Sequence, residues 1–186
     1  MFTNVTISGR TCTGTTTLAL LLKEKLKWQY WNAGQFFRDY CGKNNLKLEM
    51  ASQRPDSLTR KVDFGMRDKL KQGKHQILEA WLAGFVAKGL KGVLKVLLVC
   101  EDSLRIDRLV NREGLTVERA KEMIKIREAE NTKKWQRVYQ KEWQLWVPQN
   151  QQVPFDFWQP SLYDLVIDTY SNSREQTLSK VMEALC

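Results

Sequence analysis

The chain has 186 residues and a formal charge of +9, with 30 Lys and Arg against 21 Asp and Glu. This length fits one compact domain, and 42% hydrophobic residues with seven Trp exclude a disordered tail. No apolar run approaches the roughly 20 residues that span a bilayer, and no signal peptide is recognisable, so we expect a soluble cytoplasmic protein without membrane contact. The positive charge fits general solubility, weak attraction to nucleic acid, or a site for small polyanions, and composition alone does not decide among them.

Short apolar strands alternate with helices along the chain. The first expected elements are a strand at 4–8, a glycine-bounded loop, a helix at 16–26 and a strand at 28–31. Helices follow at 34–41, 46–52 and 57–71, then a strand at 76–79, a segment at 82–87 and a strand at 93–100. The remaining elements are helices at 102–111 and within 117–143, a loop at 147–159, a strand at 163–167 and a helix at 173–185. This alternation is typical of a parallel sheet wrapped by helices.

Side chains for metal or nucleophilic chemistry are sparse. The cysteines Cys12, Cys41, Cys100 and Cys186 are widely spaced, no pair forms a C-x-x-C motif, and His75 is the only histidine. We therefore expect no zinc site, no disulfide framework and no histidine-based triad.

The loop after the first strand has the spacing G-x4-G-x-[ST]. Such a loop presents backbone N–H groups at a helix N-terminus, where aligned peptide dipoles favour an anion. Thr16 stands where a hydroxyl would bind Mg²⁺, whereas Thr15 replaces the Lys of the strict Walker motif. We interpret the run as a phosphate-binding loop; a tight strand–helix turn is the alternative. Its residues are Gly9, Arg10, Thr11, Cys12, Thr13, Gly14, Thr15, Thr16 and Thr17.

This loop and five further motifs resemble the cytidylate kinase family, in particular its short archaeal-type branch, whose members often carry Thr in place of that Lys. In chain order the motifs lie at 6–17, 32–38, 60–63, 78–84, 111–131 and 161–169. The resemblance implies a P-loop NTPase three-layer α/β fold, in which helices flank a five-stranded parallel sheet. It also implies phosphoryl transfer from ATP, with Mg²⁺, to a nucleoside monophosphate, CMP or dCMP being favoured.

The resemblance further implies roles for segments within a single domain, 1–186. The acceptor-binding segment is 33–72, a mobile lid is 112–137, and 144–159 looks like an insertion. The loop residues Gly9 to Thr17 are expected to bind the phosphates of ATP, and Thr16 and Glu79 to bind Mg²⁺. Arg112 and Arg127 are expected to be catalytic cations. The expected acceptor-binding residues are Ala33, Gly34, Arg38, Arg60, Asp63 and Trp81. Arginine suits these positions because its planar fork binds phosphate oxygens bidentately.

Less specific interpretations stay open for several of these residues. Any single arginine could be a solvated surface charge, and Glu79 could cap a neighbouring loop. Asp63 could pair with Arg67 one helical turn away. The charged stretch from Arg112 onward could be a solvated helix face.

Departures from the family pattern fall on the acceptor side. Trp81 replaces an Arg expected to contact the acceptor phosphate, and Phe64 and Gly65 replace an Arg pair. The loss of a forked cation predicts weak or redirected acceptor use unless Arg54 or Arg67 compensates, and Trp81 could also stack on a base. The alternatives are a kinase for another monophosphate or a small hydroxylated acceptor, and a nucleotide-binding protein with weakened catalysis. Nucleic-acid binding rests on charge alone and is not favoured; we expect a monomer.

Overall fold

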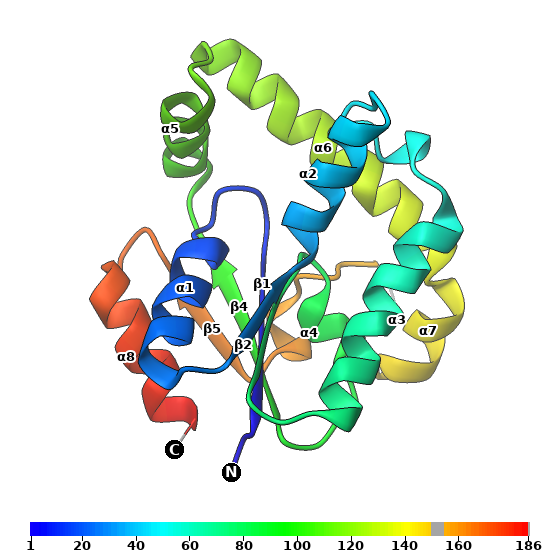
Figure 1. Ribbon diagram of the computed structural model, residues 1–186. Helices are drawn as coiled ribbons and strands as arrows, with labels where there is room; N and C mark the ends of the chain where they lie inside the picture. Colours follow the sequence, from blue (N-terminus) through cyan, green and yellow to red (C-terminus); the bar gives the residue numbers. More distant parts are fainter. Residues whose placement is uncertain (150–154, 186) are drawn as a thin grey trace.

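A five-stranded parallel sheet forms the centre of the computed structural model, which describes residues 1–149 and 155–185 (Figure 1). The strand order is β2-β3-β1-β4-β5, and every neighbouring pair is parallel. This confirms the predicted fold class. The strands are β1 (Asn4–Gly9), β2 (Gln29–Asn32), β3 (Gln76–Glu79), β4 (Val93–Val99) and β5 (Leu165–Asp168).

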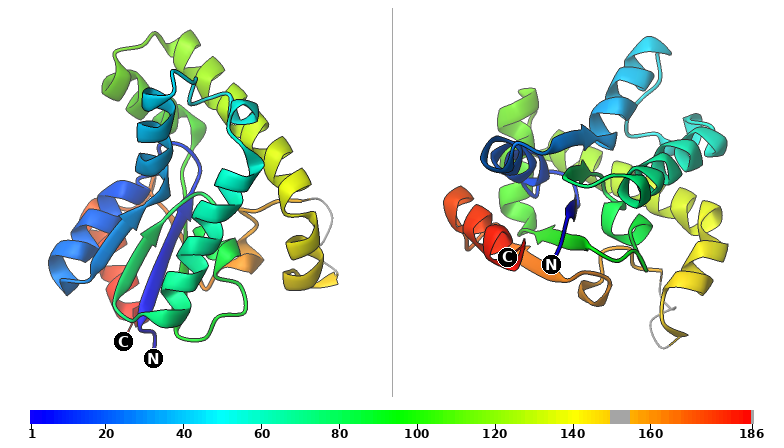
Figure 2. Two further views of the ribbon diagram at one scale, coloured as in Figure 1. Left: turned by 45° about the vertical axis from the view of Figure 1, so that its right-hand side comes forward. Right: turned by 60° about the horizontal axis from the view of Figure 1, so that its bottom comes forward.

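Helices cover both faces of the sheet, because parallel strands need crossover connections. Helices α1 and α8 lie on one face and α3 and α4 on the other, while α6 crosses above the carboxyl ends of the strands (Figures 1 and 2). The α-helices are α1 (Thr15–Leu26), α2 (Ala33–Lys43), α3 (Asp56–Gln72), α4 (Ala83–Val86), α5 (Asp102–Glu113), α6 (Val117–Val138), α7 (Gln140–Trp146) and α8 (Arg174–Leu185). Short 3₁₀ turns include η1 (Ala51–Gln53) and η3 (Pro160–Leu162).

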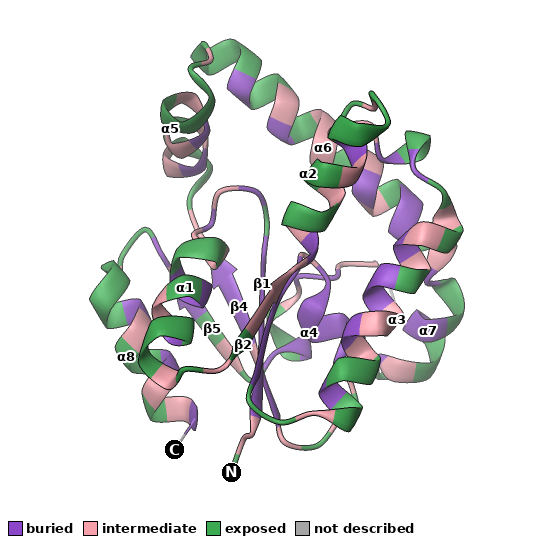
Figure 3. Ribbon diagram, in the orientation of Figure 1, coloured by how far each residue is buried: buried purple, intermediate pink, exposed green. Residues whose placement is uncertain are grey.

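The central strands are buried on both faces (Figure 3). Val5 and Ile7 of β1 belong to a core with Leu22 of α1 and Val181 of α8. The hydrocarbon side chains on alternate strand positions therefore fix α1 against the sheet, and the loop that precedes α1 is fixed with it.

A second core is dominated by aromatic rings and lies on the opposite side, under α6 and α7. Phe85 of α4 contacts Tyr139, Trp143 and Phe157 at ring-centroid distances of 6.0, 5.8 and 5.0 Å. Most of the tryptophan content near the suggested insertion is thus used in packing, as Trp143 is fully buried. Residues 147–149 and 155–159 form no α-helix or strand, in line with the predicted loop; 150–154 lie outside the described residues.

Two predicted helices differ from the structure. The helix expected at 46–52 is wrong, because only the 3₁₀ turn η1 forms there. Side chains occupy both groups of the bond that a helix would make between Leu48 and Ser52: Arg54 donates to the Leu48 carbonyl at 2.9 Å, and the Ser52 N–H donates to Glu130 Oε2 at 3.3 Å. The long helix within 117–143 divides at Tyr139, whose backbone is not helical (φ −114°, ψ 19°) and whose ring is buried.

Among the helices of residues 1–149 and 155–185, none combines the length and the apolar character that crossing a membrane requires.

Candidate active site

A cavity of about 730 Å³ opens at the carboxyl ends of the strands, between the glycine loop, α2 and α6. Parallel α/β sheets place ligands at this edge, because the loops that follow the strands meet there. The cavity is lined by most of the residues that the sequence singles out: Arg10, Thr11, Cys12, Gly14, Thr15, Thr16, Thr17, Ala33, Gly34, Arg38, Asp63, Glu79, Trp81, Arg112 and Arg127. Gly9, Thr13 and Arg60 do not line it.

Gly9 and Thr13 shape the loop from inside. A Cβ on Gly9 would lie 2.3 Å from Thr13 Oγ1 and 2.8 Å from the Leu98 carbonyl oxygen, so only glycine fits there. The Thr13 hydroxyl donates to the Arg10 carbonyl at 3.0 Å and closes the loop. Gly14 then adopts φ +97° immediately before α1, and no side chain caps that helix. The first N–H groups of α1 are consequently available for an anion.

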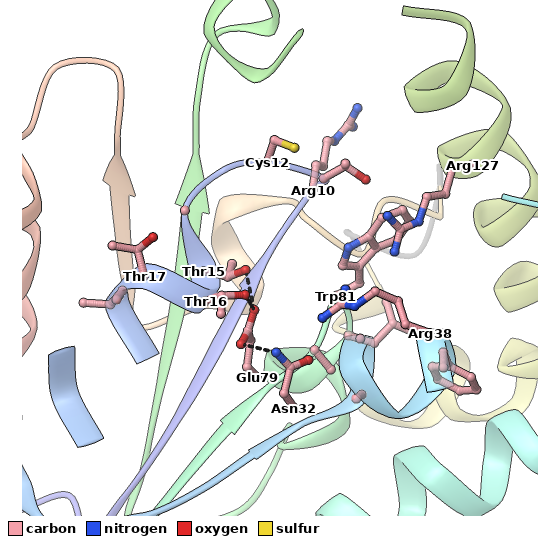
Figure 4. Close-up of a pocket in the computed structure, with 18 of the residues that line it drawn as sticks. Arg10, Cys12, Thr15, Thr16, Thr17, Asn32, Arg38, Glu79, Trp81 and Arg127 are labelled. Atoms are coloured by element: carbon pink, nitrogen blue, oxygen red, sulfur yellow. Dashed lines mark hydrogen bonds between the residues drawn. The ribbon is translucent and has the colours of Figure 1, made fainter. Parts of the chain in front are cut away.

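Glu79, the last residue of β3, accepts hydrogen bonds from the start of α1 and from β2 (Figure 4). Its Oε1 accepts from the hydroxyls of Thr15 at 2.7 Å and Thr16 at 2.6 Å. Its Oε2 accepts from Tyr30 at 2.5 Å and Asn32 at 2.7 Å. Burial, reinforced by the hydrogen bond to Glu79, raises the pKa of Tyr30, which keeps this phenol protonated as a donor. Tyr30 and Asn32 are additions to the predicted site; both stand in β2, beside the end of β3.

Among the described residues, seven arginines line the cavity, and Arg38, Arg54 and Arg112 are the three whose charges act on Arg127. The Arg127 guanidinium makes no hydrogen bond and no ion pair within residues 1–149 and 155–185, while the Arg127 backbone carbonyl accepts from Asn131 Nδ2 at 2.7 Å. The pKa of Arg127 is lowered to about 10, first by burial and then by repulsion from those three guanidinium groups. Bringing like charges together in a partly buried cavity is unfavourable unless an anion enters, so the arrangement indicates a site for a polyanion.

Two further arginines, both from α5, hold the glycine loop and were not predicted. Arg105 donates from Nε to the Thr11 carbonyl at 2.8 Å, and Arg108 donates from Nη1 to the Cys12 carbonyl at 3.0 Å. Arg108 also contacts Thr169 Oγ1 at 3.2 Å, which joins the loop to the end of β5. An arginine pair one helical turn apart, directly after a buried strand, is the sequence signal that could have identified them.

Arg54 lies between η1 and α3, and its side chain is directed at α6. It is 6% exposed and donates from Nη2 to Asn131 Oδ1 at 2.9 Å. Arg54 and Arg67 are the two arginines suggested to compensate for the cation missing at Trp81, and Arg54 does line the cavity. Arg67 does not: its guanidinium donates to the carbonyls of Val86 and Lys88 at 2.5 and 2.9 Å, away from the cavity.

Glu128 of α6 connects the expected lid to the glycine loop. Its carboxylate accepts from Arg10 Nη1 at 3.3 Å and from Arg105 Nη2. Because Arg105 also holds the loop backbone, the Glu128 carboxylate joins α6 to the glycine loop.

Asp63 lines the acceptor side of the cavity. It is 4% exposed, and its Oδ2 accepts from the Tyr139 hydroxyl at 2.5 Å. Burial raises the pKa of Asp63 to about 7, against the smaller opposing effect of that hydrogen bond. The alternative pairing of Asp63 with Arg67 does not form, since Arg67 binds backbone carbonyls instead.

Arg60 is not brought to the cavity, contrary to its assignment as an acceptor-binding residue. Its Nη1 donates to the Val138 carbonyl at 2.9 Å, and its Nη2 pairs with Glu142 Oε1 at 2.5 Å. Helix α7, which the sequence did not separate from α6, supplies this carboxylate and holds Arg60 outside. Arg60 therefore joins α3 to α7 and is left out of the site considered below.

Trp81 forms part of the cavity wall, under the guanidinium of Arg127 (Figure 4). The Arg127 Cζ lies 5.0 Å from the centroid of the Trp81 ring. Trp135 and Trp158 contact the same ring at centroid distances of 5.4 and 5.8 Å, both edge to face.

Comparisons with known proteins point to one family. The model of a family described as the cytidylate kinase-like family matches residues 4–171. A protein of Methanopyrus kandleri named cytidylate kinase is 33% identical over 193 residues, covering 97% of this chain and 92% of the relative. The Pyrococcus horikoshii protein of that name is 30% identical over 185 residues, covering 97% of this chain and 87% of the relative.

Solved structures share the fold at low identity. An uncharacterized protein from Eubacterium ventriosum has a TM-score of 0.66 at 12% identity, with 98% of both chains covered. Shikimate kinase from Acinetobacter baumannii has a TM-score of 0.56 at 14% identity, with 100% of this chain and 93% of that chain covered. At these identities the likeness concerns the fold alone.

Proposed function

The chain belongs to the cytidylate kinase-like family, and from this premise we propose that it transfers the terminal phosphoryl group of ATP to CMP or dCMP. The observation that carries the proposal is the cavity in which the glycine loop faces converging arginines. The guanidinium of one of them, Arg127, has no hydrogen bond or ion pair within 1–149 and 155–185. Such a site suits a phosphoryl group whose charge is spread over several oxygens.

The donor half of the proposed site is the loop from Gly9 to Thr17. Backbone N–H groups at the start of α1 would bind the phosphates of ATP, and Arg10 would add a positive charge beside them. Arg105 and Arg108 support the loop by holding its carbonyl oxygens, so that its N–H groups face the ligand.

The proposed cofactor is Mg²⁺, bound together with ATP. The Thr16 hydroxyl and the Glu79 carboxylate lie 2.6 Å apart on the cavity wall, and oxygen donors of this kind fit a magnesium ion that also binds phosphates and water. When bound, Mg²⁺ would neutralise charge on the donor phosphates. Thr16 and Glu79 are the residues that would hold it.

The acceptor half lies between α2, α3 and Trp81. Arg38 would bind the acceptor phosphate, Ala33 and Gly34 allow close approach of the chain, and Asp63 offers a hydrogen-bonding group to the base or sugar. A Cβ on Gly34 would lie 3.0 Å from Asn32 Oδ1, so glycine leaves room for the Asn32 side chain at the start of α2.

In the proposed reaction an oxygen of the acceptor phosphate attacks the terminal phosphorus of ATP, the bond to the bridging oxygen breaks, and ADP leaves. Arg112 and Arg127 would neutralise the transferring group, and closure of α6 would exclude water. No covalent enzyme intermediate is required. We place the protein in the cytoplasm as a monomer; the free thiols of Cys12, Cys41 and Cys100 agree with a reducing compartment.

The test is a coupled ADP-release assay with ATP and Mg²⁺, using CMP, dCMP, UMP, AMP and GMP as acceptors and shikimate as a non-nucleotide control. We expect the highest kcat/KM with CMP or dCMP. Arg38→Ala should raise the KM for the acceptor, whereas Lys43→Ala, an exposed change on the same helix, should not. ADP release that no monophosphate stimulates would refute the proposal, and preference for another acceptor would establish one of the alternatives.

A further inference from the structure

Arginines rest on the faces of two neighbouring tryptophans in the cavity wall. Arg127 of α6 lies 5.0 Å above Trp81, and Arg10 of the glycine loop lies 4.7 Å above Trp158. Trp81, Trp135 and Trp158 contact one another edge to face at 5.4, 5.8 and 5.8 Å, and we call these three residues the tryptophan cluster. The position where the family pattern has an arginine thus carries an aromatic ring with a guanidinium on top.

We propose that Trp81 is a positioning residue that holds Arg127 in the cavity, so that a cation from α6 replaces the one missing at position 81. The proposal rests on the proposed phosphoryl transfer, in which Arg127 contacts the transferring group.

The first argument concerns what else could hold Arg127. Within residues 1–149 and 155–185 its guanidinium has no hydrogen bond and no ion pair, and the charges of Arg38, Arg54 and Arg112 repel it. A long side chain in that situation would turn toward solvent, because it has several rotatable bonds to do so. The negatively polarised face of Trp81 is the attractive contact that opposes this, and such contacts strengthen when water is excluded.

The second argument concerns the rigidity of Trp81. Trp135 and Trp158 are 6% and 8% exposed and press against the Trp81 ring from its edges. Trp135 stands on α6, eight residues after Arg127, so the same helix supplies both the cation and one of the residues that fix its platform. The ring therefore cannot rotate away without disturbing α6.

The same geometry reverses an expectation drawn from the family pattern. From the family pattern alone, Trp81→Arg is expected to restore the missing cation. In the structure it would place a second guanidinium against Arg127 and remove the ring that attracts it. We therefore expect Trp81→Arg to lower activity toward the acceptor.

The test is a double-mutant cycle. Trp81→Leu, Arg127→Met and the double variant are compared with the wild type in kcat and KM for ATP and CMP. We expect Trp81→Leu to lower kcat about ten-fold or more with the KM for ATP changed less than two-fold, and Trp81→Phe, which keeps an aromatic face, to retain most of the activity. In the Arg127→Met background, Trp81→Leu should have no further effect. An equal loss in both backgrounds would overturn the proposal and indicate direct packing or stacking on the acceptor base.

A second measurement does not depend on turnover. In ¹H–¹⁵N spectra of the arginine Nε groups, the ring current of Trp81 should displace the Arg127 resonance, which Arg127→Met identifies by its absence. Trp81→Leu should move that resonance toward the position of exposed arginines, whereas Trp28→Leu, a tryptophan packed against the other core, should not. An unmoved resonance in folded Trp81→Leu would refute the contact. If the wild type phosphorylates no nucleoside monophosphate, the proposed function fails while this spectrum still decides whether Trp81 holds Arg127.

Discussion

Burial of the Asp63 carboxyl predicts a specific dependence of stability on pH. Its pKa is about 7 in the folded protein, raised from the ordinary 3.8 chiefly by burial. Between about pH 4 and pH 7 the folded state therefore binds a proton that the unfolded chain has released. The free energy of unfolding must then fall as pH rises through this range and become level above it.

The size of the effect follows from the same two values. At 1.36 kcal/mol per pH unit, the difference between 3.8 and about 7 corresponds to about 4 kcal/mol of unfolding free energy. Asp63→Asn removes the ionisation and leaves an amide oxygen that can accept from the Tyr139 hydroxyl, which the wild-type carboxylate accepts at 2.5 Å. We expect the variant to match the wild type near pH 4 and to exceed its stability by about 2–4 kcal/mol near pH 8.

Urea unfolding followed by tryptophan fluorescence at pH 4.5, 6 and 8 measures this difference. Subtracting the free energy of unfolding of the wild type from that of the variant cancels the titration of the groups common to both proteins. Asp68→Asn is the matched control, because Asp68 lies on the same helix with a side chain 60% exposed. A difference between Asp63→Asn and the wild type that stays constant across pH would show that the carboxyl titrates normally and would refute the reasoning.

Three further predictions concern the loop and α6. Gly9→Ala should abolish ATP binding in calorimetry, since its Cβ would lie 2.3 Å from a loop oxygen, whereas Gly42→Ala, with open space around it, should bind normally; equal affinities would contradict the loop geometry. Thr16→Val should raise the Mg²⁺ concentration needed for half-maximal activity several-fold more than Thr15→Val, and the reverse order would transfer the metal role to Thr15. Glu128→Gln should speed hydrogen exchange in the first half of α6 without nucleotide, because the amide cannot pair with two arginines at once; unchanged exchange would show that the helix is held elsewhere.

The parts of the site that lie close together in the chain could be predicted from the sequence. The glycine loop depends on a strand, two glycines and a helix start in succession, and a Cβ at Gly9 is excluded by the Thr13 hydroxyl of its own loop. Glu79 could be placed for a similar reason, because it ends a short buried strand and strand ends meet at one edge of the sheet. The alternation of short apolar strands with helices likewise predicts a parallel sheet with helices on both faces.

Residues whose role depends on a distant partner could not be assigned this way. Arg54 is held by Asn131, 77 positions later, and Arg60 is drawn out of the site by Glu142, 82 positions later. Neither pairing leaves a local pattern. The helix expected at 46–52 failed for a related reason, because the side chains of Arg54 and Glu130 bind the Leu48 carbonyl and the Ser52 N–H, which a helix would have joined.

The contacts of α6 also restrict how the length of this helix can change in evolution. Arg127, Asn131, Lys134 and Trp135 recur at intervals of four, three and one residues, so they share one face of the helix. Arg127 and Trp135 both contact Trp81, Asn131 accepts from Arg54, and Lys134 donates to the Ala51 carbonyl. Inserting one residue between Arg127 and Asn131 would rotate the guanidinium by about 100° relative to the rest of this face, and the cation would point away from the cavity. An insertion of seven residues would restore the angle but displace Arg127 by about 10 Å along the axis. Among relatives that keep this site, sequence change in α6 is therefore expected as substitution on its outward face, with insertions and deletions confined to its two ends.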